Sequence, residues 1–591
     1  MKKLILIFLL FLLNPILVLS TDNEFNTTQK VSYSIDEHGN AKVIHQISIT
    51  NNFSNIYPKE YLLEIFGQNI ENIKGSDPYG DIIQSTDKTA ENTTIKIKFN
   101  NPTSGKNKKT NFNINYSIPG LAQQKGQLWE INLPQQNETN SQISLKIPDD
   151  FGNLVFCSVK NEIKQQKNYK EIFFNNKQKQ KITMAFGNTQ IFDFELKFFL
   201  ENKAQDNIRT SIPIPPDTNT QNIIITKIDP SPENIVADLD GNWLAEYQLN
   251  SNTQKEIIVT GQAEVHPIDY SFDNPPDFQK LTVEQKFWPV NDPNIQKINS
   301  NLHSAKDIYQ YVVNTLDYDY QQIDQAKRKG ALTALINPAN SLCTEFTDLF
   351  ITLARNKTIP AQEIEGYAFT NKPELKPVNI NTDILHAWPQ FWDKEKNAWI
   401  TIDPTWEKTT EGIDYFSNTD LNHIVFVIHG HNSQYPAPPG SYKNSTQQKS
   451  IKVDFANHRI HPENTDPIIF LSKSKQASAQ SAFGGTKVII QNNNSSSTKN
   501  IDLSIKKQNW TQKIDIMPPF SRLEFNLPKI NPILSLLPKN KNLEFTLNIQ
   551  GQEKQTQIVP YPQHHQNTTS FVIIIIGLLT LGGIILVKQK K

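Results

Sequence analysis

The chain has 591 residues, several times the size of a single domain, so the sequence predicts at least three or four domains and excludes one compact core. Lysine and arginine together number 59, as do aspartate and glutamate, and this formal net charge of zero argues against nucleic acid as a partner. Aromatic residues make up 10%, which argues against general disorder in a chain that is otherwise polar.

Residues 1–20 have the pattern of a secretory signal peptide. Lysines at the start precede an apolar run from Leu4 to Leu13, and Val18-Leu19-Ser20 supplies a cleavage site of mostly small residues. The alternative is an uncleaved membrane anchor, but the apolar run is short for a span and Asn14-Pro15 interrupts it. We therefore expect export and a mature chain that begins near Thr21.

Residues 31 to about 266 alternate between apolar and polar side chains, as half-buried strands do. The run Phe112, Ile114, Tyr116 and Ile118 is one example, and His38-Gly39-Asn40 is placed as a hairpin turn. This pattern predicts two β-sandwich modules, residues 21–138 and 139–266, divided by the Asn- and Gln-rich stretch near residues 135–141.

The pattern changes after a proline-containing stretch at residues 267–289. Apolar residues at helical spacing then predict an amphipathic helix with Asp292-Pro293 as its upstream start: Ala305, Ile308, Tyr309, Val312, Val313 and Leu316. This helix indicates a different domain, residues 267–440. Alternation returns beyond the proline-rich stretch 436–440, and predicts a third β-sandwich module at residues 441–565.

Residues 571–587 form an uninterrupted apolar and glycine stretch, followed by lysines in the tail 588–591. Seventeen residues span about 25 Å as a helix, the lower limit for crossing a bilayer. The lysines predict a cytoplasmic C-terminus, so we expect a single-pass membrane protein whose residues 21–570 are extracytoplasmic. A buried core helix is the alternative, but no segment follows that could cover it.

The sequence contains no phosphate- or dinucleotide-binding motif, no GxSxG or HExxH pattern and no paired CxxC, so we predict neither a cofactor nor a metal. His429-Gly430-His431 and His564-His565 lack a third ligand at suitable spacing and are interpreted as exposed loop histidines. The two cysteines, Cys157 and Cys343, are too few for a disulfide framework, although one bridge between them would be an alternative to a free thiol.

Cys343 is predicted to begin a helix. It follows a Pro-Ala-Asn-Ser loop, and Phe346, Leu349, Phe350 and Leu353 then recur at helical spacing. Free amides and the positive end of the helix dipole favour a thiolate at such a position, and a thiolate is the nucleophilic form of cysteine. The position alone is also compatible with an inert, buried thiol.

A hairpin downstream places a histidine near an aspartate. Two strand-like runs, 386–392 and 398–404, flank a short connection. If Lys394-Glu395 forms a two-residue turn, His386 faces Asp403 directly, with β-carbons about 5 Å apart. A carboxylate in that position can hold the imidazole tautomer while the other ring nitrogen addresses a third group. A longer turn would break this register.

Together these segments resemble the catalytic core of the transglutaminase-like superfamily, a papain-like thiol fold. The resemblance covers residues 305–406 and is carried by the motifs Leu316-Asp317-Tyr318, Gly330-Ala331, Cys343-Thr344-Glu345-Phe346, Leu353-Ala354-Arg355, Ile359-Pro360-Ala361, Glu365-Gly366-Tyr367, His386-Ala387-Trp388, Trp399 and Asp403-Pro404-Thr405. It implies Cys343 as nucleophile, His386 as general base and acid, and Asp403 as the residue that orients His386. The expected fold is multidomain, with β-sandwich modules flanking a central α+β papain-like core and one C-terminal transmembrane helix.

The sequence also departs from the family pattern. Ser341-Leu342 precedes the cysteine where the family usually has a glycine, and Thr358 and Gln362 replace the usual glycine and arginine around Ile359-Pro360-Ala361. These changes bear on loop geometry and on the shape of the substrate site. No ligands match the calcium sites of animal transglutaminases.

The resemblance implies acyl transfer through a thioester on Cys343, with protein or peptide carboxamide or peptide bonds as substrate. An amine acceptor would give crosslinking, whereas water would give protease or amidase activity, and the sequence leaves both open. The alternative is a non-catalytic surface protein whose sandwiches and papain-like scaffold bind a partner. A cell-wall hydrolase would need a wall-binding module, and none is recognised.

Overall fold

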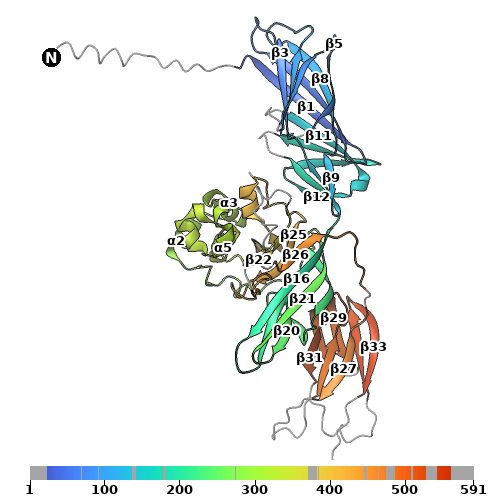
Figure 1. Ribbon diagram of the computed structural model, residues 1–591, viewed down its shortest axis with the longest axis vertical. Helices are drawn as coiled ribbons and strands as arrows, with labels where there is room; N and C mark the ends of the chain where they lie inside the picture. The colour runs from blue at the N-terminus through green and yellow to red at the C-terminus, as the bar shows by residue number, and fades with distance from the viewer. Residues whose placement is uncertain are drawn as a thin grey trace, which may run out of the picture.

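The computed structural model describes residues 23–67, 69–90, 92–135, 141–176, 182–272, 274–325, 327–370, 383, 385–410, 412–444, 449–462, 465–473, 486–506, 510–527 and 542–560. It shows an elongated, mostly β-sheet protein with several domains, in which the helices gather in one lateral domain about half-way along the long axis (Figure 1).

Three sheets enclose the core of the N-terminal region. Their strands are β1 (Phe25–Ile35), β2 (Ala41–Asn51), β3 (Glu60–Phe66), β4 (Glu71–Asp77), β5 (Gly80–Asp81), β6 (Ile83–Lys88), β7 (Asn92–Lys98), β8 (Lys109–Ile118), β9 (Ala122–Lys125), β10 (Leu128–Asn132), β11 (Ser141–Pro148), β12 (Asn153–Cys157), β13 (Asn161–Gln165), β14 (Tyr169–Asn176) and β15 (Thr183–Gly187), with the short 3-10 turn η1 (Asp149–Phe151) after β11. The sheet orders are β13-β14-β11-β1-β2-β8-β4-β5, β3-β7-β6 and β12-β15-β10-β9.

These strands confirm the predicted alternation, because every second side chain of β8 is buried and the predicted turn at residues 38–40 joins β1 to β2. The parallel pairing of β11 with β1 is a non-local contact that the alternation does not reveal. It carries one sheet across the expected boundary at residues 138 and 139, and the shared core extends as far as Phe186. The limits of the modules 21–138 and 139–266 stay a prediction.

Two further sheets form the second core. Their strands are β16 (Gln190–Asn202), β17 (Ile208–Ile214), β18 (Gln221–Asp229), β19 (Asn234–Ala237), β20 (Trp243–Leu249), β21 (Thr253–Val265) and β26 (Ile451–Phe455). Their orders are β18-β21-β16-β26 and β17-β20-β19. Strand β26 comes from the segment expected to belong to the module 441–565, yet it pairs with β16, so the chain returns to this sheet after the helical domain.

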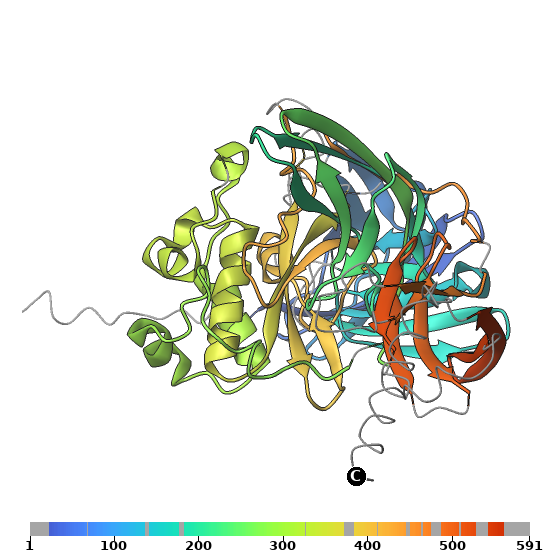
Figure 2. The same cartoon turned by 90° about the horizontal axis from the view of Figure 1, so that it is seen from below.

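The helical domain contains α2 (Pro293–Asn299), α3 (Ala305–Thr315), α4 (Ala331–Ile336), α5 (Cys343–Asn356), α6 (Pro404–Thr409), the 3-10 turns η2 (Tyr320–Gln325) and η3 (Pro338–Asn340), and the strands β22 (Ala361–Ala368), β23 (His386–Asp393), β24 (Ala398–Thr401) and β25 (His423–His429). The sheet has the order β24-β23-β22-β25, and the helices lie on one side of it (Figure 2).

The predicted helix of this domain is confirmed as α3, whose apolar stripe is buried. Its start differs from the prediction. Asp292 caps the separate helix α2 by accepting a hydrogen bond from the Asn294 backbone, whereas Ser304 caps α3 by accepting one from the Asp307 backbone. A second capping residue within twelve positions therefore divides the expected helical region into two.

The C-terminal region is again all β. Its strands are β27 (Ile468–Lys473), β28 (Thr486–Gln491), β29 (Thr498–Ile505), β30 (Thr511–Met517), β31 (Arg522–Asn526), β32 (Asn542–Ile549) and β33 (Gln552–Pro560). They form sheets with the orders β27-β28-β31 and β30-β29-β32-β33 around a common apolar core.

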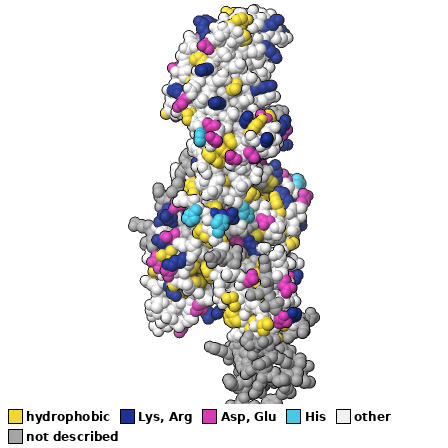
Figure 3. Space-filling model, turned by 90° about the vertical axis from the view of Figure 1, so that its right-hand side faces the viewer, with side chains coloured by type: hydrophobic (Ala, Val, Ile, Leu, Met, Phe, Trp, Pro, Cys, Tyr) yellow, Lys and Arg dark blue, Asp and Glu magenta, His cyan; other side chains and the backbone are white. Residues whose placement is uncertain are grey.

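The predicted signal peptide (1–20), transmembrane helix (571–587) and tail (588–591) lie outside the described residues. Among the helices that the structure does describe, none combines the length and the apolar character needed to cross a bilayer. Basic and acidic side chains are interspersed on the face shown in Figure 3, as the formal net charge of zero leads one to expect.

Candidate active site

Cys343 is the first residue of α5, as predicted, and its side chain is largely buried. The helix start is held by Glu345, whose carboxylate accepts hydrogen bonds from the backbone N–H of Leu342 (3.0 Å) and of Lys329 (2.8 Å). Leu342 has an extended backbone with φ of −113°, which any residue adopts, so the family glycine is not needed before the cysteine. Cys343 and Cys157 are both free thiols, so the alternative of a bridge between them is wrong.

The hairpin that carries His386 has a longer turn than predicted. Its register pairs Gln390 with Thr401 and Asp393 with Ala398, which leaves residues 394–397 as a four-residue turn. The Asp393 carboxylate accepts from the backbone N–H groups of residues 395 and 396, and Asn397 is left-handed at φ 51°, a conformation that asparagine tolerates. The predicted two-residue turn, and the strand register that followed from it, are therefore wrong.

His386 and Asp403 nevertheless meet by another route. Asp403 lies beyond β24 as the N-cap of α6, where its Oδ1 accepts from the backbone N–H of Trp406 at 2.9 Å. Its Oδ2 is 2.7 Å from Nε2 of His386. The Tyr309 hydroxyl donates to the Asp403 carbonyl at 3.1 Å. The carboxylate is thus fixed by the helix start and not by a cross-strand pair.

The second ring nitrogen of His386, Nδ1, has no hydrogen bond of normal geometry among the described residues, and the ring is almost completely buried. Burial opposes protonation, but the charge of Asp403, the hydrogen bond to it and the neighbouring Cys343 thiol together raise the pKa of His386 to about 9. The indole rings of Trp388 and Trp406 stack at 5.6 and 5.4 Å from the imidazole. These contacts leave Nδ1 available to the thiol.

A second imidazole, absent from the sequence-based prediction, lies on the other side of Asp403. Nε2 of His423 is 3.2 Å from the same Oδ2, and its Nδ1 is 2.8 Å from Oδ1 of Asp420. Burial would raise the pKa of Asp403, but the two imidazoles hold it well below its usual range. The sequence signal was the Asp420-Leu-Asn-His423 spacing just before the apolar run of β25.

Residues 290–404, the segment that contains Cys343, His386 and Asp403, match the transglutaminase-like superfamily. This segment is a transglutaminase-like domain. The second imidazole, His423, lies beyond the matched residues of the domain.

Solved structures similar to the chain that carries this domain include a "putative cysteine protease" from Cytophaga hutchinsonii, which is 14% identical over 46% of this chain and 87% of its own, with a TM-score of 0.30. The periplasmic domain of TgpA from Pseudomonas aeruginosa is 13% identical over 38% of this chain and 91% of its own, with a TM-score of 0.21. An M1 zinc metallopeptidase from Deinococcus radiodurans is 9% identical over 32% and 44%, with a TM-score of 0.19. Such low scores carry no argument about activity, and a comparison with curated proteins found no match.

A buried ionic cluster connects the sheet to α5 and to the loop before α4, and we define it as Arg328, Asp348, Glu363, Glu365 and His429. Arg328 bridges Asp348 and Glu363, with 2.8 Å to Oε2 of Glu363, and His429 bonds the same oxygen at 3.0 Å. His429 is therefore a buried strand residue and not the predicted exposed loop histidine, because its side chain pairs inside the domain.

Among the described residues, two groups of side chains bring three donor atoms within 4.8 Å of one another: His386, Asp403 and His423 in one, Glu363, Glu365 and His429 in the other. In the first group, the imidazole nitrogens that would face an ion already bond the Asp403 carboxylate. In the second, Oε2 of Glu363 is taken by Arg328 and His429. We therefore interpret both groups as hydrogen-bonded ion clusters.

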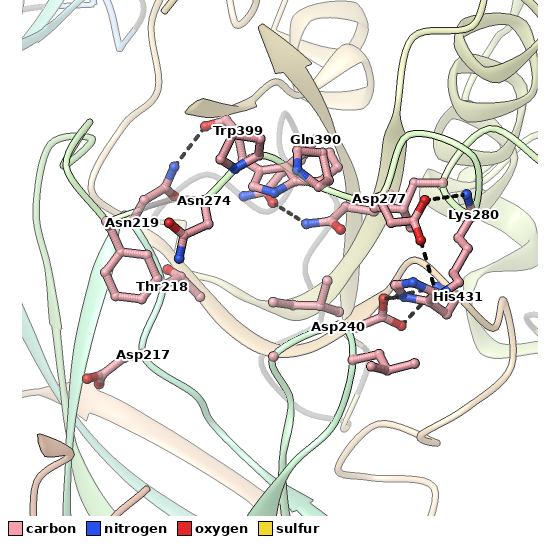
Figure 4. A pocket seen from close by; sticks show the side chains of 18 residues that line it. Asp217, Thr218, Asn219, Asp240, Asn274, Asp277, Lys280, Gln390, Trp399 and His431 are labelled. Atoms are coloured by element: carbon pink, nitrogen blue, oxygen red, sulfur yellow. Dashed lines mark hydrogen bonds and ion pairs between the residues drawn. The ribbon is translucent and has the colours of Figure 1, made fainter. Parts of the chain in front are cut away.

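A cavity of about 360 Å³ lies where the sheet of the transglutaminase-like domain meets loops of the second core (Figure 4). Gln362 donates to Gln390 at 3.1 Å on its wall, and Asn219 donates to the Trp399 carbonyl at 2.8 Å. Gln362 is the residue that replaces the family arginine, so this departure bears on the cavity. Cys343, His386 and Asp403 do not line it.

Proposed function

We propose that Cys343, His386 and Asp403 form the catalytic triad of a thiol acyl-transfer enzyme acting on carboxamide or peptide bonds of proteins or peptides. One observation carries the proposal. Asp403 holds Nε2 of His386 at 2.7 Å, which leaves Nδ1 for Cys343, a free thiol at a helix N-terminus that interacts with this imidazole. The free nitrogen alone does not mark a catalytic imidazole, because the buried His45 also leaves its Nδ1 unbonded; the mark of His386 is the thiol beside that nitrogen.

The chemistry follows from this arrangement. Nδ1 of His386 takes the thiol proton, and the Cys343 sulfur attacks the substrate carbonyl carbon. The backbone N–H of Cys343, at the start of α5, is a donor for the developing oxyanion. When the C–N bond breaks, His386 returns its proton to the departing amine and a thioester on Cys343 is left.

The thioester is resolved by a second nucleophile. His386 removes a proton from the incoming amine or water, which attacks the acyl carbon, and the sulfur leaves as thiolate and regains the proton from His386. An amine yields a new amide, so that two substrates are crosslinked, whereas water yields a carboxylate. Asp403 stays ionised throughout and stabilises the imidazolium.

We also propose that the enzyme acts outside the cell at the membrane surface. This proposal is supported by the signal-peptide pattern at residues 1–20 and by the apolar stretch 571–587 with its lysine-rich tail. The catalytic domain and the β-sandwich modules would then lie on the extracytoplasmic side, where protein and peptide substrates are found.

The limited exposure of Cys343, 8% of its surface, favours the binding scaffold as second candidate, because substrate must reach the sulfur. The pH dependence of Cys343 alkylation by iodoacetamide distinguishes the two. Full-length protein in detergent with Cys157→Ser, which leaves Cys343 as the single thiol, is compared with the same chain carrying His386→Ala. Rapid labelling well below the ordinary thiol pKa of about 8.5, lost in the variant, supports the enzyme. Equal, slow labelling in both contradicts it.

A further inference from the structure

His423 has an oxygen acceptor at each ring nitrogen. Nδ1 lies 2.8 Å from Oδ1 of Asp420, and Nε2 lies 3.2 Å from Oδ2 of Asp403. A neutral imidazole carries one N–H and could donate to only one of these carboxylates, so that its other lone pair would face an oxygen lone pair. Two good contacts therefore require either an imidazolium or a protonated carboxyl.

The surroundings of both carboxylates exclude the protonated carboxyl. Asp403 accepts from the backbone N–H of Trp406 and from His386. Asp420 accepts from the backbone N–H of Asn422 at 3.0 Å and from the Tyr415 hydroxyl at 3.4 Å. Because donors surround both groups, both are carboxylates and His423 is doubly protonated. Although burial opposes the charge, Asp420 and Asp403 raise the pKa of His423 to about 9, in agreement with this geometry.

The same oxygen of Asp403 therefore serves two imidazoles. The two rings lie 5.8 Å apart between centroids, and both are buried. At this distance in a poorly screened interior, a fixed positive charge on His423 repels a second one on His386. Without His423, the Asp403 carboxylate would make His386 hold its proton more tightly than it does with the charged His423 beside it.

We propose that His423 is a positioning residue: an imidazolium, charged at neutral pH, that shares the Asp403 carboxylate with His386 and limits how tightly His386 holds its proton. The inference rests on the proposed function, since it assigns a task to His386. In acyl transfer, His386 must accept the thiol proton and then release it to the leaving amine, and too strong a base would slow that release. The order of groups is Asp420, His423, Asp403, His386, with Cys343 at the end.

Among the described residues, the groups that contact His423 are Asp420 with the Tyr415 hydroxyl behind it, Asp403 at the start of α6, His386 on β23, and the uncharged indole rings of Trp388 and Trp406. Asp403 is also held by the backbone of Trp406, so it keeps its orientation when His423 is replaced.

His429 supplies a matched control on the same strand. Its Nδ1 is 3.0 Å from Oε2 of Glu363 and its Nε2 is 2.7 Å from the Pro436 carbonyl, so it too has acceptors at both nitrogens. Neither hydrogen-bond partner belongs to the candidate triad. A variant of His429 therefore removes a buried imidazolium without altering Asp403.

The test uses full-length protein in detergent with Cys157→Ser. Alkylation rates of Cys343 are measured from about pH 4 to about pH 11 with neutral iodoacetamide and with anionic iodoacetate. An imidazolium beside the thiolate attracts anionic iodoacetate but not neutral iodoacetamide. The ratio of the iodoacetate rate to the iodoacetamide rate therefore falls at the pH at which His386 loses its proton. The native sequence is compared with His423→Gln, which keeps a donor for Asp403 but no charge, and with His429→Gln.

In His423→Gln we expect the pH at which the ratio falls to rise by about one unit. In His429→Gln we expect this pH to stay at its native value. If the single variant does not fold, the double substitution His423→Gln/Asp420→Asn replaces it, because it leaves no buried carboxylate unpaired. The pH at which the ratio falls is expected to rise in this variant as well. An unchanged or downward position overturns the proposal. A native profile without reactivity below the ordinary thiol range overturns the proposed function as well, and is recognised without any His423 variant.

Discussion

The two ion clusters of the transglutaminase-like domain differ in one respect that separates reactivity from structure. Strand side chains alternate, so the register that pairs Gly366 with His386 and Glu363 with Pro389 places His386 and Glu363 on opposite faces of the sheet. On the face of Glu363, His429 uses both ring nitrogens. On the other face, His386 uses only Nε2.

The comparison teaches that burial and charge do not by themselves mark a catalytic histidine. Burial opposes protonation at both imidazoles, and carboxylates raise the pKa of His386 and of His429 alike to about 9. What distinguishes them is a free nitrogen beside a thiol.

Replacement of the nucleophile should have the largest effect. In the Cys157→Ser background, Cys343→Ala removes the thiol beside His386, so covalent labelling and turnover should disappear completely. The change removes one atom at the start of α5, where the hydrogen bonds from Leu342 and Lys329 to Glu345 remain, so the melting temperature should change little. Mass spectrometry after incubation with an amide-based electrophile measures labelling, and turnover that persists in the variant would contradict the proposed nucleophile.

Asp403→Asn should cost about ten-thousandfold in reactivity at neutral pH. The amide keeps an oxygen for the Trp406 backbone, and asparagine is a good N-cap, so α6 should still form. Its NH₂ group would face Nε2 of His386, which would favour the tautomer with the proton on Nδ1 and block acceptance of the thiol proton. Alkylation kinetics with circular dichroism as the folding control measure this effect. Full reactivity would mean that Asp403 serves only the helix.

The structural cluster should show the reverse behaviour. Arg328→Met leaves Asp348 as a buried carboxylate without a cation and Glu363 with His429 alone, and should lower the free energy of unfolding by about 3–5 kcal/mol. Reactivity of Cys343 in the folded fraction should stay near the native value. The exposed Arg209, whose side chain is 82% accessible, provides the control Arg209→Met, which should change neither quantity. A loss of reactivity without a loss of stability in Arg328→Met would break the comparison.

The stability of the folded state should fall as pH rises through the range in which buried histidines are protonated in the folded chain but not in the unfolded chain. The folded pKa values of His386, His423 and His429 are about 9, against about 6.5 in the unfolded chain. Between these values the folded state binds more protons, so their contribution is complete below about pH 6.5 and is lost above about pH 9. At about 1.4 kcal/mol per pKa unit, this rise corresponds to about 3 kcal/mol of stability per histidine.

Thermal melting followed by tryptophan fluorescence measures this slope, because Trp288, Trp388, Trp392, Trp399 and Trp406 lie in the helical domain. His429→Gln should flatten the slope between about pH 6.5 and about pH 9, whereas the exposed control His38→Gln should leave it unchanged. Melting temperatures that rise with pH in this range would show that the sign is wrong.

Local chemistry made much of this site predictable. The helix start at Cys343 follows from a loop and an apolar stripe within a dozen residues, and the nearness of His386 to Asp403 follows from a short hairpin. The predicted strand register was wrong because it assumed a two-residue turn at Lys394-Glu395. The Asp393 carboxylate and the left-handed Asn397 instead set a four-residue turn.

Long-range pairing was not predictable from the same patterns. His423 reaches Asp403 because β25 pairs with β22, more than fifty residues earlier in the chain. The pairing of β11 with β1 likewise joins segments that alternate in the same way as their neighbours. Periodicity identifies which side chains of a strand are buried, but it does not identify the partner strand.

The smallest effect concerns the connection between α5 and β22, which carry residues of both clusters. Thr358, exposed and left-handed at φ 58°, follows the helix cap; its N–H donates to Arg355 at 2.9 Å, and the next N–H donates to Ala354 at 3.0 Å. This is a Schellman motif, in which glycine is favoured because a β-branched residue is strained there.

Thr358→Gly should relieve about 1–2 kcal/mol of strain and lose about half of that to the greater freedom of the unfolded chain. Thr358→Asn, which tolerates the conformation with less added freedom, should stabilise by a similar amount, and unfolding monitored by tryptophan fluorescence measures both. Because neither change touches a cluster, Cys343 reactivity should stay constant; destabilisation by glycine would mean that the threonine is not strained.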